Sequence, residues 1–135
     1  MILVDTGPLV AAANRKDARH AESVAALAAA SRPRLVPGLV IAEVCYLLAR
    51  DAGTAVEAQF LRSFSGFLTV VDVTAVDLDR AAELVEQYAN LPLDATDACL
   101  VALAERLKIT DIATLDRRDF GIVRPCHVNA LTLVP

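Results

Sequence analysis

Short apolar segments alternate with segments of helical length along the chain, and this alternation restricts the fold more than any other feature. The short segments are rich in Val, Ile, Leu and Thr, as strands are. Strands that are separated by helices require crossover connections, which give a parallel sheet with helices on both faces. We therefore expect an α/β fold with a mainly parallel sheet. The expected strands are residues 2–5, 34–38, 67–73, 111–116 and 130–134.

Six helices are expected between these strands. The first should run from Gly7-Pro8 to about Asn14, because proline suits a first helical turn. Asp17 is a good N-cap for the second helix, which should continue to about residue 30. The remaining helices are expected at 39–53, at 54–66, from Thr74 or Asp77 to about Asn90, and at 94–107.

The length and composition fit a single domain over residues 1–135 with an aliphatic core. Hydrophobic residues make up 56% of the chain, yet there are only two Tyr, four Phe and no Trp. No run approaches the roughly 18 uninterrupted apolar residues of a membrane span, and no basic region precedes an apolar stretch at the N-terminus. We therefore expect no membrane association and a cytoplasmic location.

The three cysteines do not form a metal motif. Cys45, Cys99 and Cys126 are odd in number and too widely separated for C-x2-C pairs. We expect buried free thiols, with no disulfide framework.

The net charge of −4 argues against a protein that binds nucleic acid through its basic character alone. It does not argue against a metal-dependent enzyme. Bound divalent ions would locally reverse the charge that a phosphate meets at a group of carboxylates.

Two aspartates stand directly after strand-like segments. Asp5 follows the apolar residues 2–4, and Asp116 follows residues 112–115. In parallel sheets, ligand sites form beyond the carboxyl ends of the strands. Asp5 and Asp116 are therefore expected to face one site and are candidates for neighbours.

Glu43 is expected on an apolar helix face. A buried carboxylate is costly unless it is paired or bound to a cation, so the residue is a cation ligand, the partner of an arginine in a salt bridge, or a boundary residue at the edge of the helix. Its neighbours at i−4, i−3, i+3 and i+4 are Leu39, Val40, Tyr46 and Leu47.

Asp94 and Asp97 open the helix at 94–107. Asp94 suits an N-cap, and Asp97 in the first turn suits the helix dipole. Asp97 also shares its helix face with Leu100, Val101 and Ala104, which points it toward the core. Asp119 could cap a turn after Asp116.

Four acids, Asp5, Glu43, Asp97 and Asp116, can thus converge in one pocket. Oxygen ligands without His or Cys suit Mg²⁺ or Mn²⁺, and a cation would neutralise carboxylates that otherwise raise one another's pKa. Such sites serve phosphoryl transfer with an activated water. Arg117 and Arg118, with Arg124 nearby, could hold substrate phosphates.

The sequence resembles the PIN-domain family and, within it, the VapC-type toxins of bacterial toxin–antitoxin pairs. Four motifs carry the resemblance in the family's order along the whole chain: VDTGPLVA with Asp5, VIAEVCYLL with Glu43, DATDACLVALAE with Asp97 and ATLDRRDF with Asp116.

The resemblance implies an α/β/α sandwich, Mg²⁺-dependent endoribonuclease activity, a homodimer, and an antitoxin that inserts into the active site. We expect cleavage in single-stranded or loop regions of RNA, where a phosphate can enter the acidic pocket. It implies that Asp5, Asp97 and Asp116 hold the metal and that Glu43 binds through water or aligns the nucleophile. Thr6 and Thr114 are candidates for hydrogen bonds to a ligand carboxylate or a phosphate. Asp94 and Asp119 match no position of the family's quartet.

Three other functions compete with this interpretation. VDTG also matches an aspartic protease motif, but that fold is nearly all β and needs strands before the motif. A phosphatase or phosphoacceptor domain would use Asp5, yet no D-x-D follows the first strand. A non-catalytic interaction module with a vestigial acidic pocket could dock a partner on a stripe of Phe60, Phe64 and Phe67.

Overall fold

The computed structural model describes residues 1–135 and contains one five-stranded sheet in the order β3-β2-β1-β4-β5. All neighbouring strands are parallel. The strands are β1 (Ile2–Val4), β2 (Arg34–Pro37), β3 (Thr69–Val71), β4 (Asp111–Ala113) and β5 (Thr132–Val134). The helices are α1 (Thr6–Ala13), α2 (His20–Ala29), α3 (Gly38–Asp51), α4 (Thr54–Arg62), α5 (Ala75–Gln87), α6 (Ala95–Leu107) and α7 (Arg117–Ile122).

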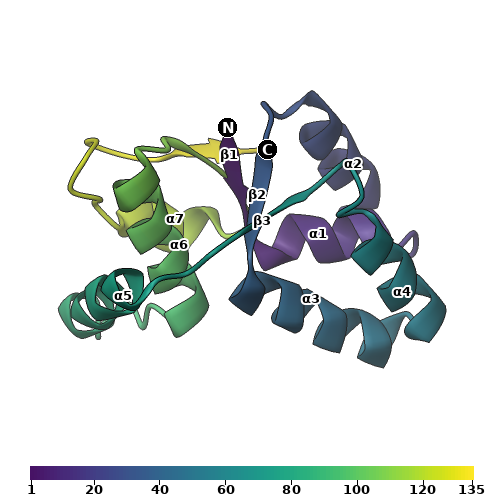
Figure 1. The fold of residues 1–135 in the computed structure, drawn as a ribbon, viewed down its shortest axis with the longest axis horizontal. Coiled ribbons are helices and arrows are strands. Elements are labelled where there is room, and N and C mark those ends of the chain that lie inside the picture. Colours follow the sequence, from purple (N-terminus) through teal and green to yellow (C-terminus); the bar gives the residue numbers. More distant parts are fainter.

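The helices form two layers around the sheet. Figure 1 shows α1 to α4 on one side of the sheet and α5, α6 and α7 on the other. The expected three-layer α/β/α sandwich with a parallel sheet is therefore confirmed. None of the helices has the length and apolar character that crossing a lipid bilayer requires.

The core is densest around β1 and α6. Strand β1 lies between β2 and β4, so its side chains are covered on both faces, and Leu3 and Val4 are fully buried. Helix α6 is buried around its whole circumference from Asp97 to Glu105, which is typical of a helix packed inside a domain. Its alanines allow close approach to α5.

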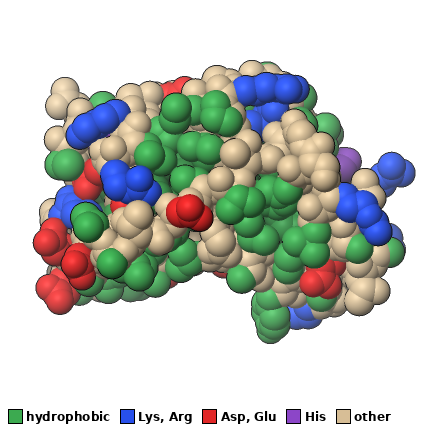
Figure 2. Space-filling view, viewed as in Figure 1, with side chains coloured by type: hydrophobic (Ala, Val, Ile, Leu, Met, Phe, Trp, Pro, Cys, Tyr) green, Lys and Arg blue, Asp and Glu red, His purple; other side chains and the backbone are tan.

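Strand β3 is an edge strand, and the surface beside it is apolar. Val70 is 55% exposed, and Phe67, just before the strand, is 40% exposed. Figure 2 shows hydrophobic side chains gathered over the middle of this face, with most Lys and Arg side chains toward its edges.

Three local expectations were wrong. Residues 117–122 form a helix, α7, that is too short for apolar periodicity to reveal. Asp17 does not cap α2: its side chain accepts the Arg19 N–H at 2.8 Å and forms a turn before the helix begins at His20. Of the free cysteines only Cys99 is buried, while Cys126 is exposed because it lies in the loop between α7 and β5.

Candidate metal-binding active site

The predicted acids lie in one pocket at the carboxyl edge of the sheet. Strands β1 and β4 are parallel neighbours, and the Asp5 N–H donates to the Ala113 carbonyl at 2.9 Å. The chain segments that follow both strands therefore emerge side by side. The pocket has a volume of about 710 Å³ and is lined by Asp5, Thr6, Gly7, Glu43, Asp94, Asp97, Leu115, Asp116, Arg117 and Arg118.

Asp5 is held at both carboxylate oxygens. As the N-cap of α1, it accepts the Thr6 N–H at 2.7 Å on Oδ1, and Oδ2 accepts the Thr114 hydroxyl at 2.8 Å. Burial raises the pKa of Asp5, and the negative charges of Glu43 and Asp94 raise it further, while the two hydrogen bonds oppose this rise. The carboxylate is thus fixed in orientation but lacks a neutralising charge.

Two threonine hydroxyls connect the acids. Thr114 is fully buried, and its oxygen also accepts the Asp116 N–H at 3.0 Å, so one side chain joins Asp5 to the backbone that carries Asp116. On the other side of the pocket, the Thr6 hydroxyl donates to Glu43 Oε2 at 2.9 Å. Both threonines bond carboxylates of the predicted site.

Glu43 is half-buried on α3 and belongs to none of the five ion pairs of the structure. The alternative of a salt bridge to an arginine is therefore wrong. The apolar residues Val40, Val44 and Leu48 of α3 face the core, and Glu43 points along the edge of that face toward Thr6. Its second oxygen, Oε1, has no protein partner, which leaves it free for a ligand.

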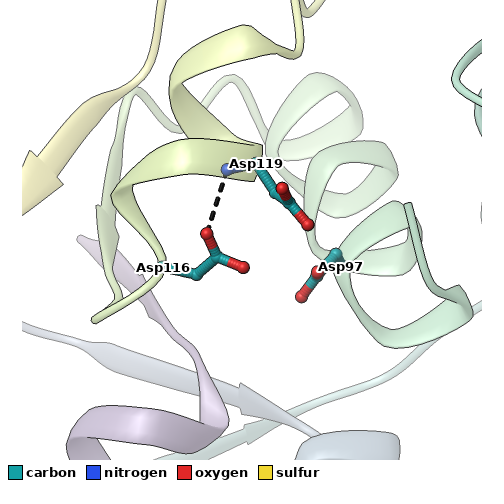
Figure 3. A group of neighbouring side chains, drawn as sticks. All are labelled: Asp97, Asp116 and Asp119. Atoms are coloured by element: carbon teal, nitrogen blue, oxygen red, sulfur yellow. Dashed lines mark hydrogen bonds between the residues drawn. The ribbon is translucent and has the colours of Figure 1, made fainter. Parts of the chain in front are cut away.

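Asp97, Asp116 and Asp119 form the tightest acidic cluster. One carboxylate oxygen of each lies within 4.8 Å of the other two (Figure 3). Asp97 comes from the first turn of α6, while Asp116 is the N-cap of α7 and accepts the Asp119 N–H at 2.9 Å. The cluster therefore bridges the N-terminal ends of two helices, where N–H groups favour negative charge.

Burial and repulsion raise the pKa values of Asp97 and Asp119. Asp97 is 9% exposed, and burial together with Asp5, Asp94, Asp116 and Asp119 raises its pKa to about 8. Burial and Asp116 likewise raise the pKa of Asp119, although Arg118 opposes this. A buried carboxylate without an ion pair needs a proton or a cation.

A divalent cation fits this site. The available ligands are carboxylate oxygens, with neither His nor Cys among the pocket residues. Hard oxygen donors of this kind suit Mg²⁺ or Mn²⁺ better than zinc. The pocket can therefore bring a divalent cation, a water and a phosphate together.

The structure shows the contacts of Asp94 and Asp119, the two acids that match no position of the family's quartet. Asp94 is the N-cap of α6, as expected, and accepts the Asp97 N–H at 2.9 Å while it lines the pocket. Asp119 joins the cluster and does not cap a turn. A repeated pattern in the sequence could have pointed to Asp119. A capping aspartate is followed by a second aspartate three residues later both at Asp94 and Asp97 and at Asp116 and Asp119.

Of the three arginines predicted to hold substrate phosphates, two line the pocket and one does not. Arg117 and Arg118 line the pocket, and Arg117 also donates to the carbonyl oxygen of Pro135. Arg124 lies outside it, because its guanidinium turns back to the Gly121 and Val123 carbonyls at the end of α7.

A larger apolar groove of about 830 Å³ lies between α1, α2, α4 and the chain after α4. Phe60 and Phe67 line it, whereas Phe64 packs edge-on against Phe60 with ring centroids 5.6 Å apart. Helix α4 ends at Arg62, so the three phenylalanines do not form one helical stripe. The rim carries Arg15, Lys16 and His20.

Known proteins share both the sequence pattern and the fold. The model of the PIN domain family matches residues 2–124. Ribonuclease VapC26 of Mycobacterium tuberculosis is 30% identical over 135 residues, which cover 99% of this chain and 100% of that protein. The crystal structure of VapC20 from the same organism, described as a sarcin-ricin loop cleaving toxin, has a TM-score of 0.85 and 25% identity, covering 96% of this chain and 99% of that one. A toxin–antitoxin complex from Klebsiella pneumoniae has a TM-score of 0.72 at 18% identity and covers 100% and 97%.

Proposed function

The chain belongs to the PIN-domain family, and from this premise we propose that it is a Mg²⁺-dependent endoribonuclease toxin that a cognate antitoxin inhibits. The observation that carries the proposal is the convergence of Asp5, Glu43, Asp97 and Asp116 on one pocket without a neutralising arginine or lysine ion pair. VapC26 is named a ribonuclease, which supports RNA as the substrate.

In this proposal Asp5, Asp97 and Asp116 hold the metal, and Asp119 joins them because its carboxylate lies in the same cluster. Mn²⁺ would serve as well as Mg²⁺, since both take oxygen ligands. The bound ion would activate water and stabilise negative charge on the phosphorus. Cleavage by water would leave a 5′-phosphate and a 3′-hydroxyl.

The other pocket residues orient the reacting groups. Thr6 holds one oxygen of Glu43, so the free Oε1 is aimed to hold a water or to take its proton. Thr114 fixes Asp5 and the backbone at Asp116. Arg117 and Arg118 at the pocket would bind backbone phosphates of the RNA.

The antitoxin is the proposed protein partner. Toxin–antitoxin complexes share this fold, and the apolar groove beside α1, α2 and α4 offers room for an apolar segment of a partner. Arg15 and Lys16 line the groove, and the one acid of its lining, Asp51, is paired with Arg50, so the groove favours a segment that also carries acids. A homodimer and a cytoplasmic location remain expectations from the family resemblance and the composition.

The test is cleavage of purified cellular RNA by the antitoxin-free protein in Mg²⁺. EDTA and Asp97→Asn should each abolish discrete cuts, whereas Asp79→Asn, at an exposed position on α5 outside the pocket, should leave them intact. Cleavage that survives in Asp97→Asn would show a contaminant or a different site.

The two competing functions give different results in the same assay. Uncut RNA over a Mg²⁺ and Mn²⁺ series, together with retained antitoxin binding, would identify an interaction module with a vestigial pocket. Release of phosphate from small phosphoesters, with RNA untouched, would identify a phosphatase-like enzyme.

A further inference from the structure

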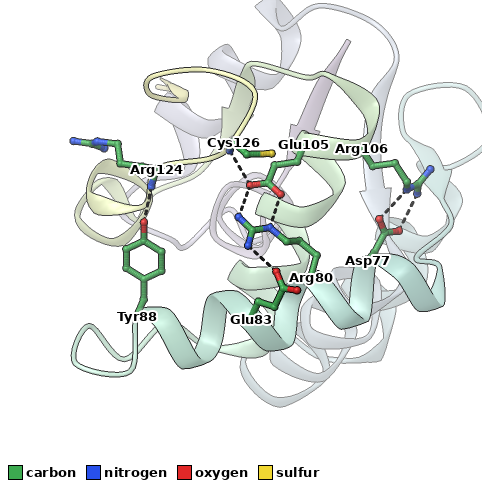
Figure 4. Close-up of polar contacts among 8 residues, drawn as sticks. All are labelled: Asp77, Arg80, Glu83, Tyr88, Glu105, Arg106, Arg124 and Cys126. Carbon is green, nitrogen blue, oxygen red and sulfur yellow. Dashed lines mark hydrogen bonds and ion pairs between the residues drawn. The ribbon is translucent and has the colours of Figure 1, made fainter.

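Glu105, near the C-terminal end of α6, is a buried acid that the proposed chemistry does not use. It is 6% exposed. Its Oε2 accepts Arg80 Nε at 2.7 Å, and its Oε1 accepts Arg80 Nη2 at 3.0 Å and the Cys126 N–H at 2.9 Å (Figure 4). Arg80 also binds Glu83 at 3.0 Å. Glu105 thus joins three parts of the chain: α5, α6 and the loop after α7.

A second ion pair beside it joins only the two helices. Arg106 of α6 donates to both carboxylate oxygens of Asp77 on α5, at 2.8 and 2.9 Å. Arg106 also donates to the Asp72 carbonyl, before α5. Neither residue bonds to the loop after α7, so this pair is a natural control for the first.

The elements that Glu105 connects are the ones that supply the acidic cluster. Helix α6 begins beside Asp97, and α7 begins at Asp116 and has only six residues. Beyond its C-terminal end, three polar contacts hold the chain: an Arg124 N–H bond to the Tyr88 hydroxyl at 3.0 Å, the Cys126 N–H bond to Glu105, and a contact of His127 Nε2 with the Ile109 carbonyl at 2.7 Å. A shift of the loop would therefore move α7 relative to α6.

We propose that Glu105 is a positioning residue that sets the separation of Asp97 from Asp116 and Asp119; this inference rests on the proposed function. The Arg80 fork fixes the Glu105 carboxylate, so that Oε1 meets the Cys126 N–H. Magnesium requires near-ideal octahedral geometry with ligands at about 2.0–2.1 Å, so a small shift between the helices weakens binding. Replacing both partners of a buried ion pair by apolar residues is often neutral for stability, so a positioning role can be tested separately from stability.

Mn²⁺ binding to the antitoxin-free protein tests the proposal, with paramagnetic resonance of free Mn²⁺ as the readout. Two double variants replace the ion pair and differ in whether the side chain at position 105 offers an oxygen acceptor. Arg80→Met with Glu105→Gln keeps an oxygen for the Cys126 N–H, whereas Arg80→Met with Glu105→Leu removes it. Arg106→Met removes the bonds to Asp77 and to the Asp72 carbonyl and leaves the Cys126 N–H bond to Glu105 in place.

We expect the Leu variant to bind Mn²⁺ about threefold to tenfold more weakly than the wild type, somewhat less than the loss of a direct partner of a metal ligand. The Gln variant and Arg106→Met should stay within about twofold, since they keep the tie to the loop. RNA cleavage should fall only in the Leu variant, and added Mn²⁺ should restore it. Urea unfolding checks that each variant is folded before its Mn²⁺ affinity is compared. If the Leu variant does not fold, Arg80→Met with Glu105→Ala takes its place.

Equal Mn²⁺ affinity of the Leu and Gln variants would overturn the positioning role. So would a loss of affinity in all three variants that follows their loss of stability. A wild type that binds Mn²⁺ and cuts RNA, with an unchanged Leu variant, rejects this inference alone. A wild type that neither binds Mn²⁺ nor cuts RNA rejects the proposed function with it.

Discussion

The buried hydroxyl of Thr114 donates to Asp5 Oδ2 at 2.8 Å, across 109 positions of the sequence. The same oxygen accepts the Asp116 N–H at 3.0 Å. A single side chain therefore holds together the ends of β1 and β4, which are neighbours in the sheet. This bond fixes the geometry of two proposed metal ligands at once.

Thr114→Val should lower RNA cleavage by about 10- to 100-fold, because Asp5 loses the partner that orients it. The shape of the side chain is retained, but a buried oxygen and a buried N–H are left unpaired, which should lower the free energy of unfolding by about 1–3 kcal/mol. Thr114→Ser keeps the hydroxyl and is the matched control. Cleavage rates over a Mg²⁺ series and urea unfolding measure both effects; equal activity of the two variants would contradict the orienting role.

Asp97→Asn should stabilise the metal-free protein at pH 8. The pKa of Asp97 rises from its ordinary 3.8 to about 8 in the fold. A carboxyl with a raised pKa contributes stability that is complete below the unfolded pKa and is lost as the pH rises toward 8. The Asp97→Asn variant does not lose stability in this way as the pH rises. In EDTA at pH 8 its free energy of unfolding should therefore exceed that of the wild type by about 2 kcal/mol or more, and little of this difference should remain at pH 4.

Mg²⁺ should reverse that difference, since a bound cation neutralises the ionised carboxylates and stabilises only the folded wild type. Urea unfolding at pH 4 and pH 8, with EDTA or with Mg²⁺, measures both predictions. A wild type whose stability is independent of pH and of Mg²⁺ would argue against a strained acidic cluster.

Arg106→Met should destabilise the protein at neutral pH but not in acid. Burial would raise the pKa of Asp77, but hydrogen bonds from Arg106 and Thr74 outweigh it and hold the pKa below its ordinary 3.8. A depressed pKa contributes stability that is present above the unfolded value and lost as the pH falls through the folded pKa. Arg106 is 36% exposed, so we expect a loss of about 1–3 kcal/mol at pH 7.

The difference between Arg106→Met and the wild type should shrink as the pH falls below the ordinary 3.8 toward the lowered pKa of Asp77. Urea unfolding between pH 3 and pH 7 measures it. An unchanged difference throughout this range would show that Arg106 stabilises the fold through packing of its stem and not through the ion pair.

Val24→Glu should weaken antitoxin binding by about tenfold or more without changing RNA cleavage. Val24 is 43% exposed on the apolar groove, and an unpaired carboxylate buried under a partner is costly. Val85→Glu is the matched control, because Val85 is 37% exposed on α5, outside the groove. Titration of the toxin with its cognate antitoxin measures both affinities, and equal weakening by the two variants would place the antitoxin elsewhere.

The sequence alone determined the fold class and the edge of the sheet at which two of the acids lie. Alternating strand and helix segments require parallel strands, and the carboxyl ends of parallel strands share one edge of a sheet. Asp5 and Asp116 follow such strands, so both were expected at that edge, while the strand order of the structure makes them neighbours, because β1 pairs with β4. Local capping preferences likewise predicted Asp94 as the N-cap of α6.

Only the tertiary structure decided which partners these acids have. Helix α7 is too short to show a period, so Asp119 could not be placed with Asp97 and Asp116 before the fold was known. Glu43 accepts a hydrogen bond from Thr6, 37 positions away, and not from an arginine, and only the folded chain shows which of these partners it has. The bond of Glu105 to the Cys126 N–H depends in the same way on contacts between distant segments. Local sequence fixes strands, helices and caps through short-range sterics and hydrogen bonds, whereas the environment of a charge is set by whatever the folded chain packs around it.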